Sequence, residues 1–167
     1  MKNALLLATT IILSTVGLSQ AQANEPIRAL KVLGHAEFIM NSYEEPGVTV
    51  YYSCSALIDR TKDLLKSLGA TNVSVNCYGD NGWDRPSLSP TVDAKFASAR
   101  LPSDKLRGVE TTATWENVTL RGSQDCAEVR QLLTALAPSL ELQGLKAERC
   151  FRTDSPYRYD LSVLVGR

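Results

Sequence analysis

The chain has 167 residues, with 18 basic and 18 acidic side chains, a single histidine and four cysteines. A formal charge of zero argues against a protein that binds nucleic acid mainly through its phosphates. A single histidine excludes a metal or catalytic site that needs two imidazoles from this chain. Apolar residues make up 44% of the composition, which is enough for a packed core.

Residues 1–23 have the three regions of a secretory signal peptide. Lys2 supplies the positive start, Ala4 to Val16 form an uncharged apolar run, and Ala21 and Ala23 place small residues where signal peptidase needs them. The run is too short for a transmembrane anchor, which needs about 20 apolar residues. We therefore expect cleavage after Ala23 and a periplasmic or secreted bacterial protein with no membrane span after cleavage.

The N-terminal half of the mature chain reads as strand, helix, strand, strand. The helix shows leucines at helical spacing and ends at Gly69, and the strands are β-branched or alternate between apolar and polar residues. The expected elements are strand 48–52, helix 54–68, strand 72–77 and strand 92–101. Residues 24–47 form an N-terminal segment in which we expect a further strand around Phe38 to Met40.

The C-terminal half repeats this order. Its helix starts at Asp125, which has capping-box spacing to Glu128, and stops at Pro138. The expected elements are strand 112–120, helix 125–137, strand 141–151 and strand 157–165. Apolar residues also coincide at equal offsets from Cys54 and Cys126, the cysteines at the two helix starts. We interpret this as an internal repeat.

The cysteine spacing predicts one disulfide in each half. In an exported protein an even number of cysteines favours disulfides. A helix from Cys54 rises about 21 Å and the next strand returns about 20 Å, which brings Cys77 level with the helix start. The same reasoning pairs Cys126 with Cys150. Each bridge closes a loop that should contribute about 3 kcal/mol to stability.

These elements predict an α+β fold. We expect an antiparallel sheet built from two β-α-β-β units, residues 48–104 and 105–167, which is ferredoxin-like, with both helices on one face and a disulfide inside each unit. Residues 24–167 should form one compact domain.

Part of the first unit resembles the heavy-metal-associated domain. In that family a Cys-x-x-Cys loop opens a helix, which continues through a glycine into a strand that reads like Val-Ser-Val-Asn. Here Cys54 matches the second cysteine and Gly69 stands before the strand Val73–Asn76, whereas Tyr51 occupies the position of the first cysteine. The resemblance implies shared βαβ architecture. Because a soft metal needs more than one thiolate, a metal chaperone is the least favoured function, and no metal or cofactor is expected.

Catalytic motifs give little support for an enzyme. Cys54 and Cys126 start helices, where a free thiol would have a lowered pKa, but the chain has no Cys-x-x-Cys pair. His35 is the single imidazole, and no Gly-x-Ser-x-Gly or phosphate-binding motif is present. Whether the protein is an enzyme stays open, with the balance against it. The alternative is a hydrolase or thiol-redox enzyme whose site is assembled from dispersed residues.

Two strand connections are rich in aromatic and arginine side chains, the types that concentrate binding energy at interfaces. The first contains Asn81-Gly82, a strong turn signal. The candidate partner-binding residues are Tyr78, Trp83, Asp84, Arg85, Arg152, Tyr157 and Arg158. The sequence therefore predicts an exported, non-enzymatic protein that binds a protein or peptide through these loops.

Overall fold

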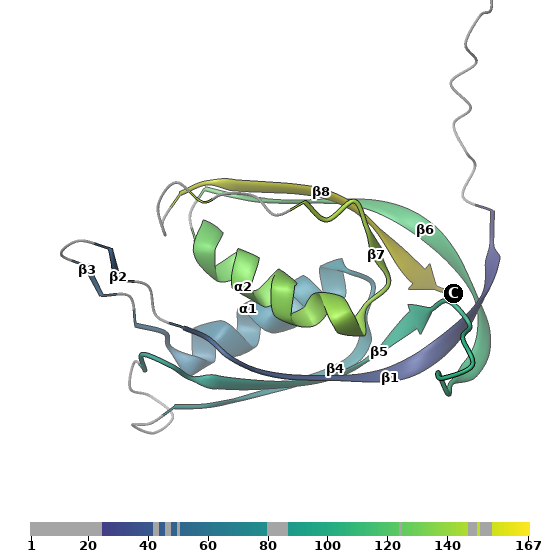
Figure 1. Cartoon of the computed structure of the whole chain (residues 1–167), viewed down its shortest axis with the longest axis horizontal. Helices are drawn as coiled ribbons and strands as arrows, with labels where there is room; N and C mark the ends of the chain where they lie inside the picture. The colour runs from purple at the N-terminus through teal and green to yellow at the C-terminus, as the bar shows by residue number, and fades with distance from the viewer. Residues whose placement is uncertain are drawn as a thin grey trace, which may run out of the picture.

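The computed structural model describes residues 25–41, 44–45, 48–49, 51–79, 87–123, 125–146, 150 and 155–167, and the structural statements below concern these residues. The predicted α+β fold is confirmed: one six-stranded antiparallel sheet accompanies two α-helices and two disulfides (Figure 1). In chain order the elements are β1 (Ile27–Ile39), β2 (Glu44–Glu45), β3 (Val48–Thr49), α1 (Cys54–Ser67), β4 (Thr71–Tyr78), β5 (Thr91–Arg100), β6 (Val109–Gly122), α2 (Cys126–Leu136), the 3-10 helix η1 (Ala137–Ser139), β7 (Leu142–Gln143) and β8 (Tyr157–Gly166).

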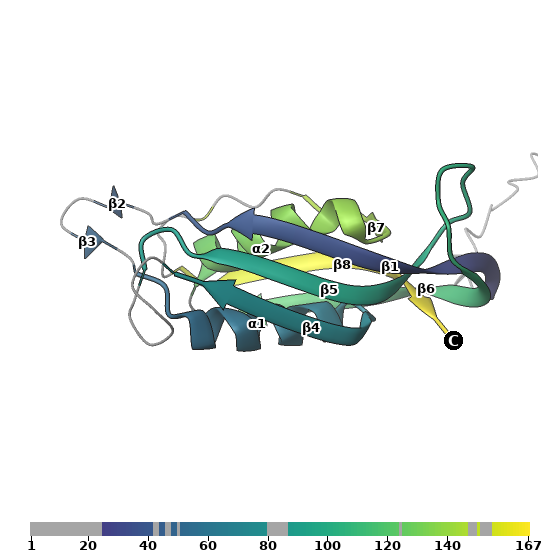
Figure 2. The same cartoon turned by 90° about the horizontal axis from the view of Figure 1, so that it is seen from below.

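The sheet folds into two layers because its two central strands diverge. Its strand order is β4-β5-β1-β6-β8-β7. β1 pairs with β5 from Leu30 to Ile39, but it pairs with β6 only from Ile27 to Lys31. Beyond Lys31, β1 continues with β5 and β4 in one layer (Figure 2), whereas β6 continues with β8 in the other. Both helices lie between the two layers (Figure 1).

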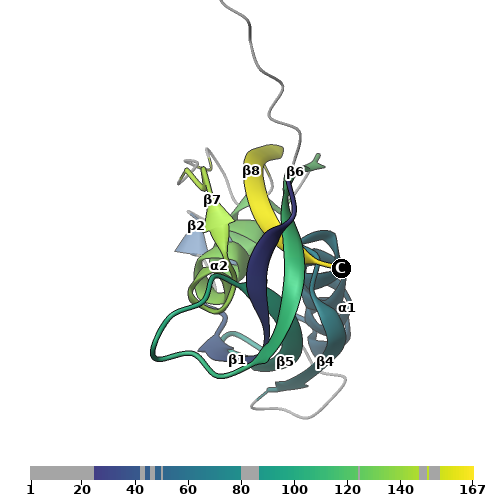
Figure 3. The same cartoon turned by 90° about the vertical axis from the view of Figure 1, so that its right-hand side faces the viewer.

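The main core fills the space between the layers. Both helices bury leucines there against the inner side of the sheet, where Phe96 of β5 and Leu161 of β8 are also buried. A second, small cluster lies where β1 and β6 pair, at the end seen in Figure 3. Its buried members are Ala29, Ala99, Ala113 and Leu164. Three of these four are alanines, whose small side chains let the strands approach closely as the sheet bends.

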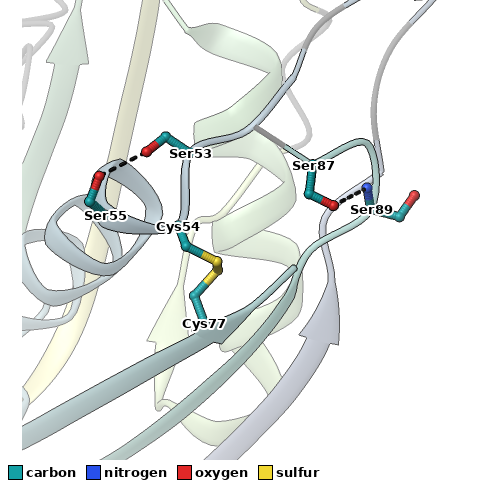
Figure 4. Close-up of a disulfide and its surroundings, with 6 residues drawn as sticks. All are labelled: Ser53, Cys54, Ser55, Cys77, Ser87 and Ser89. Carbon is teal, nitrogen blue, oxygen red and sulfur yellow. Dashed lines mark hydrogen bonds between the residues drawn. A yellow bond between two sulfur atoms is a disulfide. The ribbon is translucent and has the colours of Figure 1, made fainter. Parts of the chain in front are cut away.

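Helix α1 ends in a tight turn that requires glycine. Gly69 has φ +73°, a conformation that costs other residues free energy. A Cβ at this position would also lie 2.7 Å from Val165 Cγ2 of β8. At the other end, Ser53 stands at the N-cap, but its hydroxyl bonds to the Ser55 hydroxyl (2.8 Å) rather than to the helix backbone (Figure 4).

Both predicted disulfides are confirmed. Cys54 is bonded to Cys77 with a Cα–Cα distance of 5.4 Å, and Cys126 is bonded to Cys150 with a Cα–Cα distance of 5.7 Å. Cys54 and Cys126 are the first residues of α1 and α2. Each bridge therefore fixes the start of one helix to a later segment of the same half of the chain, and Figure 4 shows the bridge of the first half.

The strand predictions differ from the structure at two places. In the described part of the run 48–52 the structure has the two-residue strand β3, which pairs with β2 in a separate sheet, and an isolated bridge from Tyr52 to Ser87, and the long strand of this half is β1. The sequence predicts a strand only around Phe38 to Met40, because β1 carries apolar residues on both faces. Leu33, for example, is 84% exposed, so apolar and polar residues do not alternate clearly along the strand. The predicted strand 141–151 is limited to β7 in the described chain, because Gly144 turns the backbone with φ +76°.

Candidate functional site

A pocket of ≈ 540 Å³ lies where β6 ends, α2 begins and β8 begins. Leu64 of α1, Leu120 of β6 and Leu132 of α2 contribute apolar surface, and Arg60 and Tyr157 contribute polar groups. This volume is within the range of small-ligand sites. The end of β4, the start of β5 and the strands β2 and β3 lie at the same end of the molecule, on the left in Figure 1.

Arg60 joins the two helices across this pocket. Its Nη1 lies 2.7 Å from Asp125 Oδ2 and 2.9 Å from Glu128 Oε2, so one guanidinium neutralises two carboxylates of the other helix. Burial alone would lower the pKa of Arg60, but Glu128 and Asp125 outweigh burial and raise it. Arg60 therefore stays charged and holds α1 and α2 together electrostatically.

Asp125 takes an unusual backbone conformation in order to reach Arg60. As the N-cap residue of α2 it has φ 66° and ψ 28°, the left-handed region, and its side chain makes no capping hydrogen bond. The predicted capping box of Asp125 and Glu128 is therefore wrong, because both carboxylates bond to Arg60 instead. A left-handed conformation at a residue other than glycine costs about 1–3 kcal/mol, which the ion pair has to offset.

Glu128 is the most buried charged group of this cluster, with 13% of its side chain exposed. Burial raises the pKa of the Glu128 carboxyl, and Arg60 opposes this rise. Its Oε1 atom is buried and accepts no hydrogen bond from the described residues. The carboxyl is consequently held at a cost in desolvation, which the ion pair with Arg60 offsets only in part.

The ring of Tyr157 forms one wall of the pocket. A Cβ at Gly122 would lie 2.5 Å from Tyr157 Cε1, so the ring covers a position where only glycine fits. Burial raises the pKa of the Tyr157 hydroxyl, while Arg60 lowers it. The ring of Tyr159 lies next to it, with centroids 6.0 Å apart. Tyr157 was among the candidates from sequence, whereas Arg60, Asp125 and Gly122 were not assigned to a site.

The other candidates that the structure describes, Tyr78 and Arg158, do not join Tyr157 in the pocket. Tyr78 ends β4 and is 55% exposed, opposite Thr91 of β5, on a different part of the surface. Arg158 pairs with Asp160 at 2.8 Å on the exposed side of β8. The remaining candidates fall outside the described residues: Trp83, Asp84, Arg85 and Arg152.

Neither a metal centre nor a free thiol is found in the part of the chain that the structure describes. No group of three or more His, Cys, Asp or Glu side chains there could hold a metal ion. All four cysteines are in disulfides. Among the described helices, none combines the length and the apolar character needed to cross a membrane.

The comparisons with known proteins give no relative for this chain. No family model matches it, and no curated protein or solved structure matches it either.

Proposed function

We propose that this protein is an exported, non-enzymatic binding protein that recognises a protein or peptide at the pocket between α1, α2 and β6. The observation that carries the proposal is the composition of the pocket. Leu64, Leu120 and Leu132 line it beside Arg60 and Tyr157, with Leu64 and Leu132 buried and Leu120 partly exposed. Arginine and tyrosine next to a desolvated apolar surface are typical of binding hot spots.

The electrostatics of the pocket favour binding over acid–base chemistry. Arg60 already neutralises Asp125 and Glu128 at 2.7 and 2.9 Å. A catalytic acid or base needs a carboxyl that is free to exchange a proton with a substrate, whereas these two carboxylates are engaged with a cation. We assign this ion-pair cluster the role of shaping the pocket.

We also propose that the protein acts in the periplasm or outside the cell. Two disulfides are compatible with an oxidising compartment, and residues 1–23 have the pattern of a signal peptide. The two arguments are independent, since one rests on the folded chain and the other on its first segment.

We further infer that the two halves are copies of one β-α-β-β unit, ferredoxin-like in its chain order, with both helices on the inner face of the sheet. The support is the order of elements: β1, α1, β4 and β5 in the first half correspond to β6, α2, β7 and β8 in the second. The sheet order reads β4-β5-β1 and then β6-β8-β7, which is symmetric about the contact of β1 with β6. On this assignment the first unit begins at β1 rather than at residue 48.

The test is a selection of peptides on the mature chain, residues 24–167. Peptides are enriched from a random phage-displayed library. Isothermal titration calorimetry then measures their binding to the wild type and to the variants Tyr157→Ala, Tyr78→Ala and Leu33→Ala. We expect Tyr157→Ala to weaken binding by roughly tenfold or more, as for a hot-spot residue. Leu33→Ala, on the exposed face of β1, should leave binding unchanged.

Two outcomes would contradict the proposal. One is a library selection that yields no peptide with saturable binding. The other is equal binding by the wild type and Tyr157→Ala, provided that circular dichroism shows both folded. A loss of binding in Tyr78→Ala without any loss in Tyr157→Ala would move the site to the connection between β4 and β5.

A further inference from the structure

The two strands at the centre of the sheet each have an edge that no other strand covers. β1 and β6 separate after Lys31, so their facing edges are unpaired for most of their length. The backbone groups on these edges are hydrogen-bond donors and acceptors that need partners. The two edges are treated differently by the rest of the molecule.

The edge of β1 is covered in part by the second half of the chain. Gln131 Nε2 donates to the Asn41 carbonyl (3.0 Å), and the Asn41 N–H donates to Gln131 Oε1 (2.9 Å). Further along, the Ser139 hydroxyl donates to the His35 carbonyl (3.2 Å). Side chains of α2 and η1 therefore cover this edge in part, at His35 of β1 and at Asn41 just beyond the end of the strand.

The edge of β6 has no such partner. The Arg167 N–H donates to the Thr112 carbonyl (3.0 Å), so the backbone of Thr112 faces β8. Backbone groups of successive residues in an antiparallel strand point to opposite sides, which means that the odd-numbered residues of β6 face away from β8. Up to Ala113 these residues meet β1. The odd-numbered residues beyond that point are Trp115, Asn117, Thr119 and Arg121.

This edge is accessible as well as unpaired. No described residue forms a hydrogen bond with the backbone groups of these four residues, and no residue from Trp115 to Gly122 is buried. At about 3.3 Å per residue, the free edge from Trp115 to Arg121 is roughly 20 Å long. Its last part, Thr119 to Gly122, lines the pocket.

Among the other strand edges in the described chain, that of β4 is irregular at its start and that of β8 is covered in part. On β4 the register shifts between Thr71 and Ser74, and Asn72 has φ 53°, an irregularity that blunts an edge. On β8, the two-residue strand β7 pairs with Ser162 and Val163. The edge of β6 is thus a regular, exposed strand edge next to a pocket.

We propose that the free edge of β6 binds an extended segment of a partner protein as an additional strand. This inference rests on the proposed function and specifies how the partner binds. In strand addition, main-chain hydrogen bonds give affinity and pockets for alternate side chains give specificity. Here the backbones of Asn117, Thr119 and Arg121 supply the hydrogen bonds, and one side of the added strand faces the apolar surface of Leu64 and Leu120.

The charges next to the edge define the partner further. Arg121 is exposed and lies opposite Arg158 in the ladder of β6 with β8. Arg158 is already paired with Asp160, whereas Arg121 forms no ion pair with the described residues. The segment that complements this site carries an apolar side chain toward the pocket and an acidic side chain toward Arg121.

The first experiment measures amide hydrogen exchange by NMR, with a peptide selected as described above as the probe. We expect the peptide to slow exchange at Asn117, Thr119 and Arg121. The amides of Val118 and Leu120, which point to β8, serve as internal controls and should change little. A peptide that binds without slowing exchange at the three edge amides overturns the inference.

The second experiment removes a single edge N–H. Thr119→Pro and Thr119→Ala both lose the hydroxyl that donates to Asp160 (2.6 Å), but only the proline variant lacks an N–H on the free edge, a position where a strand tolerates proline. We expect affinity to fall roughly tenfold in Thr119→Pro relative to Thr119→Ala, the effect of about one hydrogen bond. Equal affinity of two folded variants contradicts the inference.

The third experiment uses the wild-type protein and therefore does not depend on the folding of a variant. The peptide is N-methylated at one residue at a time. In an added strand, the N–H groups of alternate residues point to β6 and those of the residues between them point away. Methylation of an N–H that points to β6 should abolish binding, whereas methylation of one that points away should be tolerated. A peptide that tolerates methylation at every position contradicts strand addition.

The charge of the segment is tested by reversal. Arg121→Glu should lower the affinity for an acidic peptide by roughly tenfold or more. A peptide with lysine in place of the acidic residue should restore binding to this variant. Failure of the lysine peptide to restore binding contradicts the assignment of the acidic side chain to Arg121.

The results separate the inference from the proposed function. A peptide that depends on Tyr157 but tolerates N-methylation throughout overturns strand addition and leaves the proposed function standing. A selection without any binding peptide removes the proposed function itself. Without peptide, sedimentation shows whether the wild type self-associates, and hydrogen exchange shows whether its edge amides are then protected. Both results together would make a second copy of the chain the occupant of the edge and would also overturn the inference.

Discussion

The side-chain amide of Gln131 occupies the place beside Asn41 that the peptide group of a neighbouring strand would take. One side chain satisfies both the donor and the acceptor of Asn41, and its Nε2 also lies 3.3 Å from the Tyr52 hydroxyl. Gln131 belongs to the second half of the chain, whereas Asn41 and Tyr52 belong to the first. This contact is therefore a specific link between the halves.

Replacing Gln131 by methionine should open this link while keeping side-chain length and helix propensity. The exposed backbone of Asn41 would exchange both side-chain partners for water, so we expect the free energy of unfolding to fall by about 0.5–1.5 kcal/mol. Urea denaturation measures the change. Thr134→Ala, at an exposed position of the same helix, is the control and should stay within about 0.5 kcal/mol of wild type. An equal effect of both variants would show that Gln131 acts only through the helix.

Stability should depend on pH in opposite directions through Glu128 and Asp160. The pKa of Glu128 is raised by burial, so its contribution to stability is present at low pH and is lost as pH rises through its folded-state pKa. The pKa of Asp160 is lowered by hydrogen bonds from Arg158 and Thr119, so its contribution is lost as pH falls.

Unfolding free energies measured from neutral pH down to about pH 2 test these signs, because the contribution of Asp160 is lost only below the ordinary pKa of aspartate, about 3.9. Relative to wild type, Glu128→Gln should lose stability on acidification, because the favourable protonation of the glutamate is gone. Asp160→Asn should gain relative stability over the same range, since the wild type loses the contribution of its aspartate. Parallel curves for the wild type and both variants would contradict the assignment.

Gly69→Ala should destabilise the protein for two separable reasons. The left-handed backbone penalises alanine, and the new Cβ would meet Val165. We expect a loss of roughly 2–3 kcal/mol, of which the backbone accounts for about 1 kcal/mol. In the background of Val165→Ala the steric part should disappear, so that the effect of the glycine substitution shrinks to the backbone part. Thermal denaturation of the four proteins measures both parts, and an unchanged effect in that background would exclude the clash.

Each disulfide should stabilise the fold to a similar extent. The loops closed by Cys54–Cys77 and Cys126–Cys150 have sequence separations of 23 and 24, for which the chain-entropy model gives about 3 kcal/mol each. Replacing either pair by alanines should lower the melting temperature by a comparable amount. A large difference between the two double variants would show that strain or residual structure, rather than loop entropy, dominates.

The sequence was informative wherever a local pattern decided the structure. The leucine spacing of α1 and α2 gives both helices, and the distance travelled by helix and strand gives the pairs Cys54–Cys77 and Cys126–Cys150. β1 was largely missed because Leu33 and Ile39 are exposed on the side of the strand where polar residues are expected. A strand inside a folded sheet does not need clean alternation when neighbouring strands fix its register.

The candidate site depends on contacts that no local pattern records. Arg60 lies on the polar side of α1 and reads as a solvated arginine, yet its partners Asp125 and Glu128 come from the other half of the chain. The same contacts explain the failed capping box, since a capping interaction of about 1 kcal/mol competes with an ion pair to a shared guanidinium. Tyr157 became a candidate because aromatic residues are enriched at interfaces, and its role in binding stays a prediction.

The placement of the disulfides also determines which contacts between the two halves of the chain are reversible. Both bridges join residues of the same half, and all four cysteines are used, so no disulfide connects one half to the other. Arg60 holds the halves together at the pocket through ion pairs, and Gln131 links them beside Asn41 through hydrogen bonds. Such contacts break and re-form far faster than disulfides rearrange. The protein thus combines two covalently braced halves with non-covalent contacts between them, and these contacts can break without any redox reaction.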